Sequence, residues 1–423
     1  MTRLSTLRLR LWWQSAFWVI PVLGVAAGWL LDYLSVFVDE AAYESGEQGA
    51  QFSTSAAITL LSAVAGGMVT FTGFVFSVVL LVLQFGSTQY SPRTVSYFLR
   101  SRRIQWVLAI FLATIVFSTF SVLEVGSAGR DEFVPVASII IAVWLLLISL
   151  GAFLVLLNTV SRRIRVDTVL SDIGEKSRRQ MTRRATLASE LRAEPVEHMP
   201  AAAADATLIR FAGEPGQIVA VDAKSLRRLA RRLKCQITLL VRTGDGVSVG
   251  SHIAMVSGGR ARDRRVSRCL LTADERSLSY DPLYALRILS DVALRALSPG
   301  TNDPTTAVRA LDEVEGVLRA ASPLQLGPVR LPAGEGSVIL RSPTWSDITD
   351  LALLEVVDAG LSQFQVTRRL TAMLNDLLAD LPEQRHKALL RYKRRLAQGI
   401  ETLPAEYQTV AHTGDRQGIG GSR

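Results

Sequence analysis

The chain has 423 residues, a formal net charge of +9 at pH 7 and a positive mean hydropathy of +0.26. This hydropathy argues against a wholly soluble protein, because long apolar runs fill the first 160 residues and most arginines and lysines follow them. The only cysteines are Cys235 and Cys269, and the four histidines are far apart. Their spacing matches no zinc site or disulfide framework, so we expect no metal and no cofactor.

Four apolar stretches reach the length of about 20 residues that a membrane-spanning helix needs. They are Trp12–Leu31, Ala56–Phe85, Ile104–Leu123 and Val134–Val160. The first lacks a small-residue cleavage site, so it is interpreted as a span and not as a signal peptide. We therefore predict a polytopic α-helical membrane protein with four transmembrane helices over residues 1–160.

Arginine positions predict the orientation of these helices. Arginines precede the first stretch, separate the second from the third and follow the fourth, whereas the other two loops are mainly acidic. Because positive charge accumulates on the cytoplasmic side, we expect both termini in the cytoplasm and the acidic loops outside. The expected location is the plasma (inner) membrane, with the lipid bilayer as the first partner.

Small and polar residues follow one side of the second stretch at helical spacing. They are Ser62, Gly66, Thr70, Gly73, Ser77, Gln84 and Thr88. One interpretation is close helix packing, in which small residues let neighbouring helices approach. The other is a polar path through a homo-oligomer. In both interpretations this strip faces protein or water and not lipid.

No charged residue lies well inside any of the four predicted spans. Proton-coupled transporters and voltage sensors usually need such residues, so both classes are disfavoured. A passive channel and a plain membrane anchor stay compatible with the sequence.

The rest of the chain predicts a cytoplasmic α+β domain. A basic amphipathic stalk and linker occupy residues 161–206, a small β-rich unit residues 207–270, a mainly helical part residues 271–403, and a disordered tail residues 404–423. Asp222 is expected to cap a helix with a basic outer side. That side has no interleaved aromatic residues and the chain has no nucleic-acid motif, so we expect no nucleic-acid partner.

The segment Cys235–Val256 is expected to form two strands around a tight turn. Its "GDGVSVG" resembles the turn of biotinyl- and lipoyl-type barrel domains, which suggests a barrel-like unit. The carrier lysine of those domains is absent, so the resemblance implies no covalent cofactor.

Two helical patterns meet at Ser298–Pro304, "SPGTNDP". Pro299 ends the first helix, and Asp303 followed by Pro304 is typical of an N-cap and first helical position. A structural corner explains most of this stretch. The alternative is a site for a small anion or another cytoplasmic ligand at the helix N-terminus. Its candidate residues are Ser298, Thr301, Asn302, Asp303, Thr305, Thr306 and Arg309.

Two long motifs are FSxxxxxxQxxSxQYSPR, within Gly66–Thr114, and DxALRALSPGxNDPxTA, within Tyr280–Val308. Together with Val241–Val256, they resemble the domain-of-unknown-function 2254 family of predicted membrane proteins. Thr301 and Thr305 depart from the usual family residues. The resemblance implies a membrane topology, and it transfers no activity, substrate or catalytic residue.

Three classes of function stay open. The first is a membrane-anchored sensing or scaffold protein with a cytoplasmic ligand or partner domain. The second is an oligomeric channel or transport protein whose second transmembrane helix lines the path. An enzyme is the weakest class, because Ser298 has no evident histidine partner and no catalytic spacing is present. We therefore assign no catalytic residue.

Overall fold

The computed structural model describes residues 17–44, 53–89, 102–125, 134–163, 165–201, 203, 205–276, 278, 281–402 and 408. These residues belong to two compact units: a four-helix unit from the first part of the chain and an α+β unit from Val166 onward. The predicted tail at 404–423 lies, apart from Gln408, outside the described residues.

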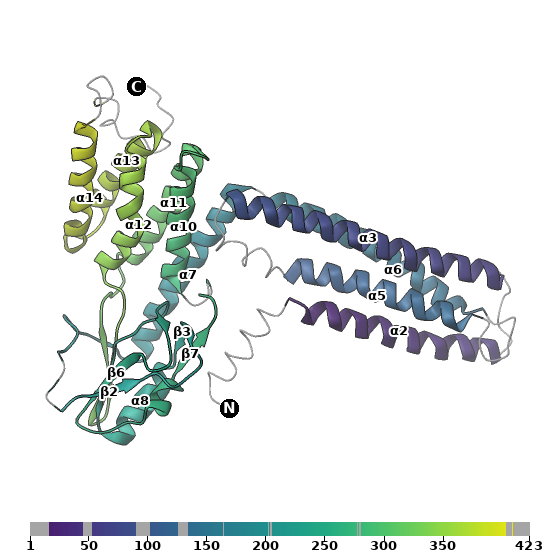
Figure 1. Ribbon diagram of the computed structural model, residues 1–423, viewed down its shortest axis with the longest axis horizontal. Coiled ribbons are helices and arrows are strands. Elements are labelled where there is room, and N and C mark those ends of the chain that lie inside the picture. The colour runs from purple at the N-terminus through teal and green to yellow at the C-terminus, as the bar shows by residue number, and fades with distance from the viewer. Residues whose placement is uncertain are drawn as a thin grey trace. The chain divides into compact units, whose positions relative to one another are not determined.

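Four apolar helices lie side by side in the four-helix unit (Figure 1). They are α2 (Val19–Glu44), α3 (Thr54–Gln89), α5 (Arg102–Glu124) and α6 (Val136–Arg163). Each is long and apolar enough to cross a membrane. The second, third and fourth helices begin and end within a few residues of the predicted spans.

The first span differs from the prediction. Residues 12–16 lie outside the described part of the chain, and α2 continues past Leu31, so that the candidate span is Val19–Ala41 and includes Asp32 and Asp39. The prediction that spans contain no internal charge is therefore wrong for α2. Acidic residues lower the local hydropathy, and the predicted span was therefore ended at Leu31, before Asp32. The helix continues because both carboxylates are buried against other helices.

The helices α2 and α5 approach most closely through glycine and alanine. A methyl group on Gly24 would lie 2.3 Å from the carbonyl oxygen of Ala109, and one on Gly28 would lie 2.5 Å from that of Ala113. Small residues four apart on both helices let the two backbones touch, which is a common mode of helix packing in membranes. In contrast, α3 packs through large side chains, with the Phe71 ring centroid 5.6 Å from that of Phe111 on α5.

The α+β unit contains two open sheets. Strands β1 (Glu194–Pro195), β8 (Val329–Ala333), β9 (Gly336–Leu340), β4 (Gln236–Leu239), β6 (His252–Ser257) and β2 (Thr207–Arg210) form the first in that order, and β5 (Gly246–Val247), β3 (Gly216–Val221) and β7 (Leu270–Ala273) the second. The sheets do not close into a barrel, so a barrel-like unit is not confirmed. The hairpin β8–β9 was not predicted as a pair, and its β9 extends the larger sheet by parallel pairing with β4.

Helices surround these sheets and continue beyond them. The long helix α7 (Val166–Glu190) follows the four-helix unit in the chain, α8 (Ala223–Leu233) begins at its predicted cap Asp222, and α9 (Asp263–Ser267) is short. On α8, Leu226 and Ala230 are buried in the core that the sheets share. The cap is confirmed by a 3.0 Å hydrogen bond from the Ser225 amide to Asp222.

The "GDGVSVG" turn joins the sheets to the C-terminal helices. Gly244 has a φ of 94°, and a side chain there would lie 2.7 Å from both Arg276 and Asp281. Asp281 is buried and caps α10 (Pro282–Ala296), and Arg276 Nη2 donates to its carboxylate at 2.6 Å. Glycine is therefore needed here for its backbone conformation and for the close approach of an ion pair.

Four more helices complete the unit: α11 (Pro304–Ala321), α12 (Trp345–Gly360), α13 (Phe364–Asp380) and α14 (Glu383–Glu401). Helices α13 and α14 are separate, because Leu381 before Pro382 is extended and the helix breaks there. Buried Arg369 links α13 to α11, with 2.7 Å to Asp312 and 2.5 Å to Glu315. Burial alone would lower the pKa of this guanidinium, but its hydrogen bonds with Glu315 and Asp312 raise the pKa above its ordinary value.

Candidate functional site

The stretch Ser298–Pro304 turns the chain from α10 into α11. Asn302 takes the left-handed conformation, with a φ of 44°, and Gly300 does not. The Asp303 amide donates to the Ala296 carbonyl at 2.8 Å, which closes the turn. Asn302 is therefore the residue of this turn that takes the left-handed backbone conformation, and asparagine tolerates that conformation.

Asp303 is the N-cap of α11 and Pro304 follows at the start of the helix, as predicted. One carboxylate oxygen of Asp303 accepts from the Thr306 amide at 3.1 Å and the other from the Thr306 hydroxyl at 2.5 Å. The Ser298 hydroxyl donates to the Arg295 carbonyl at 2.7 Å. These bonds satisfy the corner internally, and a carboxylate already occupies the positive end of the helix.

The remaining candidate residues of this corner are more exposed. Thr301 and Thr305 face solvent, and the Asn302 side chain accepts a hydrogen bond of 2.9 Å from Gln363. Arg309 lies 3.5 Å from Asp167 and 3.6 Å from Asp312, so acidic side chains already surround its charge. The structure thus brings all seven residues to one corner, and an anion site there stays a prediction.

The polar strip of α3 lies on the surface of the described chain. Ser62, Gly66, Thr70, Gly73, Ser77 and Gln84 are all exposed, while the side chain of Thr88 is outside the described residues. A methyl group on Gly66 or Gly73 would meet no atom within 4 Å. The buried residues of α3 are Ala57, Leu61, Val64, Met68, Val75 and Val79. At roughly 100° per residue, the strip points directly away from this buried face.

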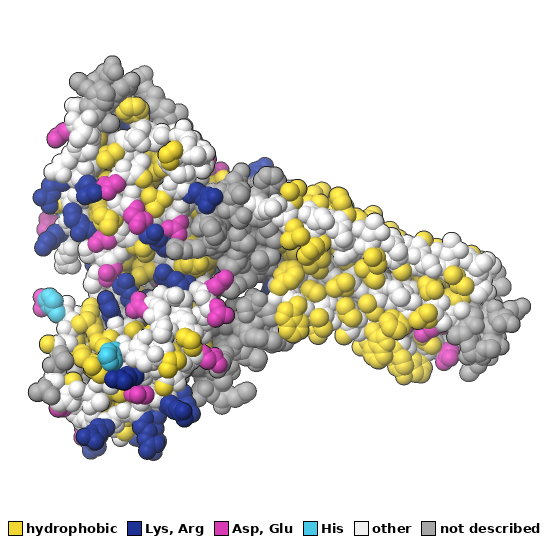
Figure 2. Space-filling model, in the orientation of Figure 1, with side chains coloured by type: hydrophobic (Ala, Val, Ile, Leu, Met, Phe, Trp, Pro, Cys, Tyr) yellow, Lys and Arg dark blue, Asp and Glu magenta, His cyan; other side chains and the backbone are white. Residues whose placement is uncertain are grey.

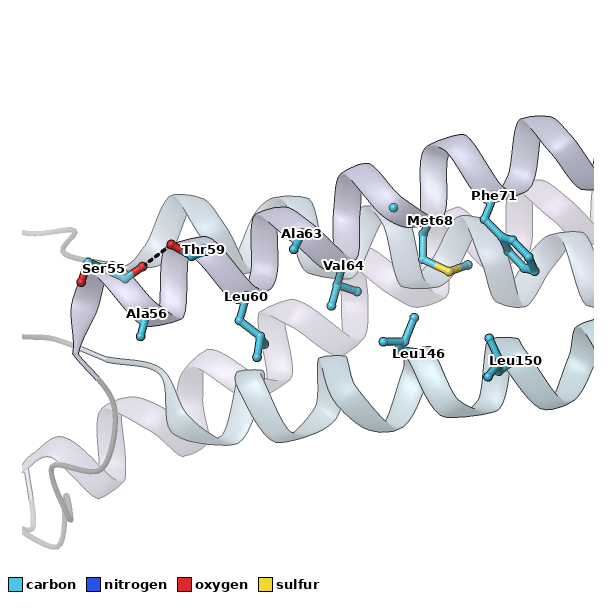
Figure 3. A pocket seen from close by; sticks show the side chains of 11 residues that line it. Ser55, Ala56, Thr59, Leu60, Ala63, Val64, Met68, Phe71, Leu146 and Leu150 are labelled. Atoms are coloured by element: carbon cyan, nitrogen blue, oxygen red, sulfur yellow. Dashed lines mark hydrogen bonds between the residues drawn. The ribbon is translucent and has the colours of Figure 1, made fainter.

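An open apolar groove of ≈ 690 Å³ runs between α3 and α6 (Figure 3). Leu60, Val64 and Met68 of α3 face Leu146 and Leu150 of α6 across it. Such a lining suits a hydrocarbon chain or an apolar ridge of another helix, and its polar side chains are the hydroxyls of Ser55 and Thr59.

A second set of polar residues is buried inside the four-helix unit, and sequence reasoning missed it. We call it the polar seam; its members are Asp32, Ser35 and Asp39 of α2, Thr114, Ser118 and Ser121 of α5, and Ser138 and Ser149 of α6. The spacing of Asp32, Ser35 and Asp39 places them on one face of a helix, and that spacing was the available signal. The seam begins where α2 and α5 end, which we call the acidic end, and it reaches the middle of α5.

Asp39 is held by three hydrogen bonds at the acidic end. It accepts hydrogen bonds from the Ala137 amide at 2.7 Å, the Ser138 amide at 3.1 Å and the Ser138 hydroxyl at 2.7 Å. It therefore caps α6 from another helix, where the exposed amides and the helix dipole both favour negative charge.

Asp32 has much weaker compensation. Its side chain is 4% exposed and, among the described residues, accepts one hydrogen bond, 2.6 Å from the Ser121 hydroxyl. One turn from Ser121, the Ser118 hydroxyl is fully buried, and Oε2 of Glu124 is also buried; in the part of the chain that the structure describes, neither atom has a hydrogen-bond partner. Deeper in the unit, Thr114 and Ser149 meet at 2.9 Å.

A family model described as predicted membrane protein (DUF2254) matches residues 14–376. Uncharacterized proteins of Mycobacterium bovis and Mycobacterium tuberculosis are each 30% identical over 387 residues, which cover 86% of this chain and 72% of theirs. No solved structure matches the chain.

Proposed function

The chain belongs to the DUF2254 family of predicted membrane proteins, and from this premise we propose that it is a homo-oligomeric membrane protein of the sensing or scaffold class. In this proposal the strip on α3 forms the contact between subunits. The α+β unit lies in the cytoplasm, where it recognises a ligand or a partner protein. The membrane is the plasma membrane.

The observation that supports assembly is the exposure of the α3 strip. Lipid-facing positions of a membrane helix favour large apolar side chains, and these flank the strip at Val69 and Phe74. The strip between them is small and polar, so it offers a notch for a second helix. A second copy of the same chain fills this notch most simply, because isologous contacts are the commonest kind in oligomers.

The strip also favours packing over a water-filled path. The Thr70 hydroxyl donates to the Gly66 carbonyl at 3.1 Å, and the Ser77 hydroxyl donates to the Gly73 carbonyl at 3.0 Å. These hydroxyls are satisfied within their own helix and need no water. A channel lined by α3 is the second candidate, because the polar strip continues from Ser62 to Gln84 along the same exposed side.

Assembly is tested with glycines. Gly73→Leu fills the notch and should shift the mass of the purified protein, measured by mass photometry in nanodiscs, from oligomer towards monomer. Gly151→Leu is the matched control, because Gly151 on α6 is equally exposed and also has no atom near its added side chain. If both variants keep the wild-type mass, or if the wild type is monomeric, the α3 interface is refuted.

Conductance and topology are tested separately. Planar-bilayer recording of the oligomer should show no ion conductance, whereas a conductance abolished by Gly73→Leu would replace the scaffold proposal with the channel. For topology, a cysteine at Ser53 should react with impermeant maleimide from outside the cell and one at Ser171 only after lysis. Reaction of the Ser171 variant in intact cells would contradict a cytoplasmic α+β unit.

A further inference from the structure

The carboxyl group of Asp32 is buried within a candidate membrane span, next to residues of α2 whose side chains are exposed and largely apolar. Its neighbours on α2, Tyr33 and Leu34, are each 52% exposed, as expected for side chains in contact with lipid. The visible face of the four-helix unit is correspondingly apolar (Figure 2). Ionisable groups at such positions are costly and usually have a function.

The charged residues that the structure describes around Asp32 are acidic. Asp32, Asp39 and Glu40 of α2 each lie within electrostatic range of Glu124 on α5. From α6, the Ser138 hydroxyl and the amides of Ala137 and Ser138 reach this cluster, and all three donate to Asp39. Among the described residues no arginine or lysine pairs with Asp32 or Glu124.

The polar atoms next to Asp32 are incompletely satisfied. Among the described residues, Asp39 has three donors, whereas Asp32 has only the Ser121 hydroxyl. Ser118 lies one turn from Ser121 on α5, closer to the middle of the helix, and its fully buried hydroxyl has no partner among the described residues. Buried polar groups are normally paired, so this unpaired hydroxyl, one turn from the serine that binds Asp32, points to a bound species.

We propose that Asp32 and Glu124, with the hydroxyls of Ser118 and Ser121, form a proton-binding site of the four-helix unit. One proton from the solution at the acidic end forms an O–H bond on this carboxyl pair and removes one of its two negative charges. No bond breaks other than that of the proton to its donor water, and nothing is oxidised or reduced. The Ser118 hydroxyl accepts or relays the hydrogen bond of the added proton.

A proton fits this site better than a metal ion. Asp32 and Ser121 are already in hydrogen-bond contact, which leaves no space for an ion between them. The described residues contain no group of three His, Cys, Asp or Glu side chains that could hold a metal ion. Two like-charged carboxyl groups in a poorly solvated place share a proton because they cannot both ionise at low cost.

The site has a consequence for the helices that contain it. Loss of the proton restores like-charge repulsion between α2 and α5 at the acidic end, while the Gly24 and Gly28 contacts hold the other end together. The proton therefore controls how closely the two helices approach there. This inference does not depend on the α3 interface, because every residue of the site belongs to one chain.

The test is infrared difference spectroscopy of the full chain in nanodiscs between alkaline and acidic buffer. The wild type should show a protonated-carboxyl carbonyl band that Asp32→Asn abolishes. Glu40→Gln removes an exposed carboxyl from the same helix and should keep the band. A band that survives in Asp32→Asn, or a wild type that lacks it, overturns the proposal.

Two further measurements separate the proton-binding site from a folding defect and from a metal-ion site. Ser118→Ala leaves both carboxyl groups in place and should shift the frequency of the band without removing it. This variant tests the site even if Asp32→Asn does not fold. Thermal melting in sodium chloride and in N-methylglucamine chloride at one pH should be the same. Stabilisation specific to sodium would identify an alkali-ion site and refute the proton. Mass photometry of the same samples reports separately on assembly.

Discussion

Removing the cap at the Ser298–Pro304 corner separates its structural role from a ligand-binding role. Asp303→Ala deletes both bonds to Thr306, one to the amide and one to the hydroxyl. An N-cap contributes about 1 kcal/mol, and a second hydrogen bond about 0.5–1.5 kcal/mol. The expected loss is therefore about 2 kcal/mol. Asp222→Ala removes the equivalent pair of bonds to Ser225 at α8 and provides the reference value.

The measurement is thermal melting of the purified chain with and without inorganic phosphate. At roughly 2–4 °C per kcal/mol for a unit of this size, Asp303→Ala should lower the Tm by about 4–8 °C. Thr305→Val should change stability by less than about 0.5 kcal/mol, because Thr305 is exposed. Phosphate should shift none of the melting curves. Phosphate-dependent stabilisation that Thr305→Val or Arg309→Ala abolishes would refute the corner interpretation and establish the anion site.

Three other predictions concern packing and reactivity. Gly24→Ala should destabilise the four-helix unit by about 1–3 kcal/mol, because its methyl group meets a carbonyl oxygen of α5 at 2.3 Å. Gly151→Ala is the control, since its methyl group has open space and should leave stability nearly unchanged. Thermal melting in detergent measures both variants. Arg369→Met should cost about 3–5 kcal/mol, since it leaves two carboxylates without their buried partner; an unchanged Tm would show that the ion pairs are not maintained. Burial, assisted by Asp222, raises the pKa of the Cys269 thiol to about 11, and burial also raises the pKa of Cys235. Maleimide at mildly alkaline pH should therefore label neither thiol until the chain is denatured.

The features that sequence predicted best are determined by a few neighbouring residues. Helix α10 ends just before Pro299, as predicted, because the proline and glycine after its end act locally. The start of α11 follows the same rule. The strands around the "GDGVSVG" turn were likewise found from their turn residues, although how they pair with the rest of the sheet was not.

The features that sequence missed depend on partners far along the chain. Helix α2 was ended too early because Asp32 and Asp39 look like loop residues by hydropathy alone. Their partners Ser121 and Ser138 are 89 and 99 residues away, and only the folded bundle brings them into hydrogen-bond distance. The strand β8 was missed for the same reason, since its place in the sheet depends on pairing with β1 as well as with β9.

The α3 strip, which is exposed, and the polar seam, which is buried, show why residue type alone does not identify a site. The α3 strip and the polar seam both consist largely of small hydroxyl residues and recur at helical spacing. On α3 the hydroxyls of Thr70 and Ser77 return to their own backbone and stay exposed, which suits a contact that another subunit completes. In the seam, the hydroxyl of Ser118 is buried without a partner among the described residues, one turn from the Ser121 hydroxyl that binds Asp32, which suits a bound proton. The strip was visible in the sequence because it lies on one uninterrupted helix. The seam was not identified from the sequence, because its hydrogen bonds form only where α2, α5 and α6 meet.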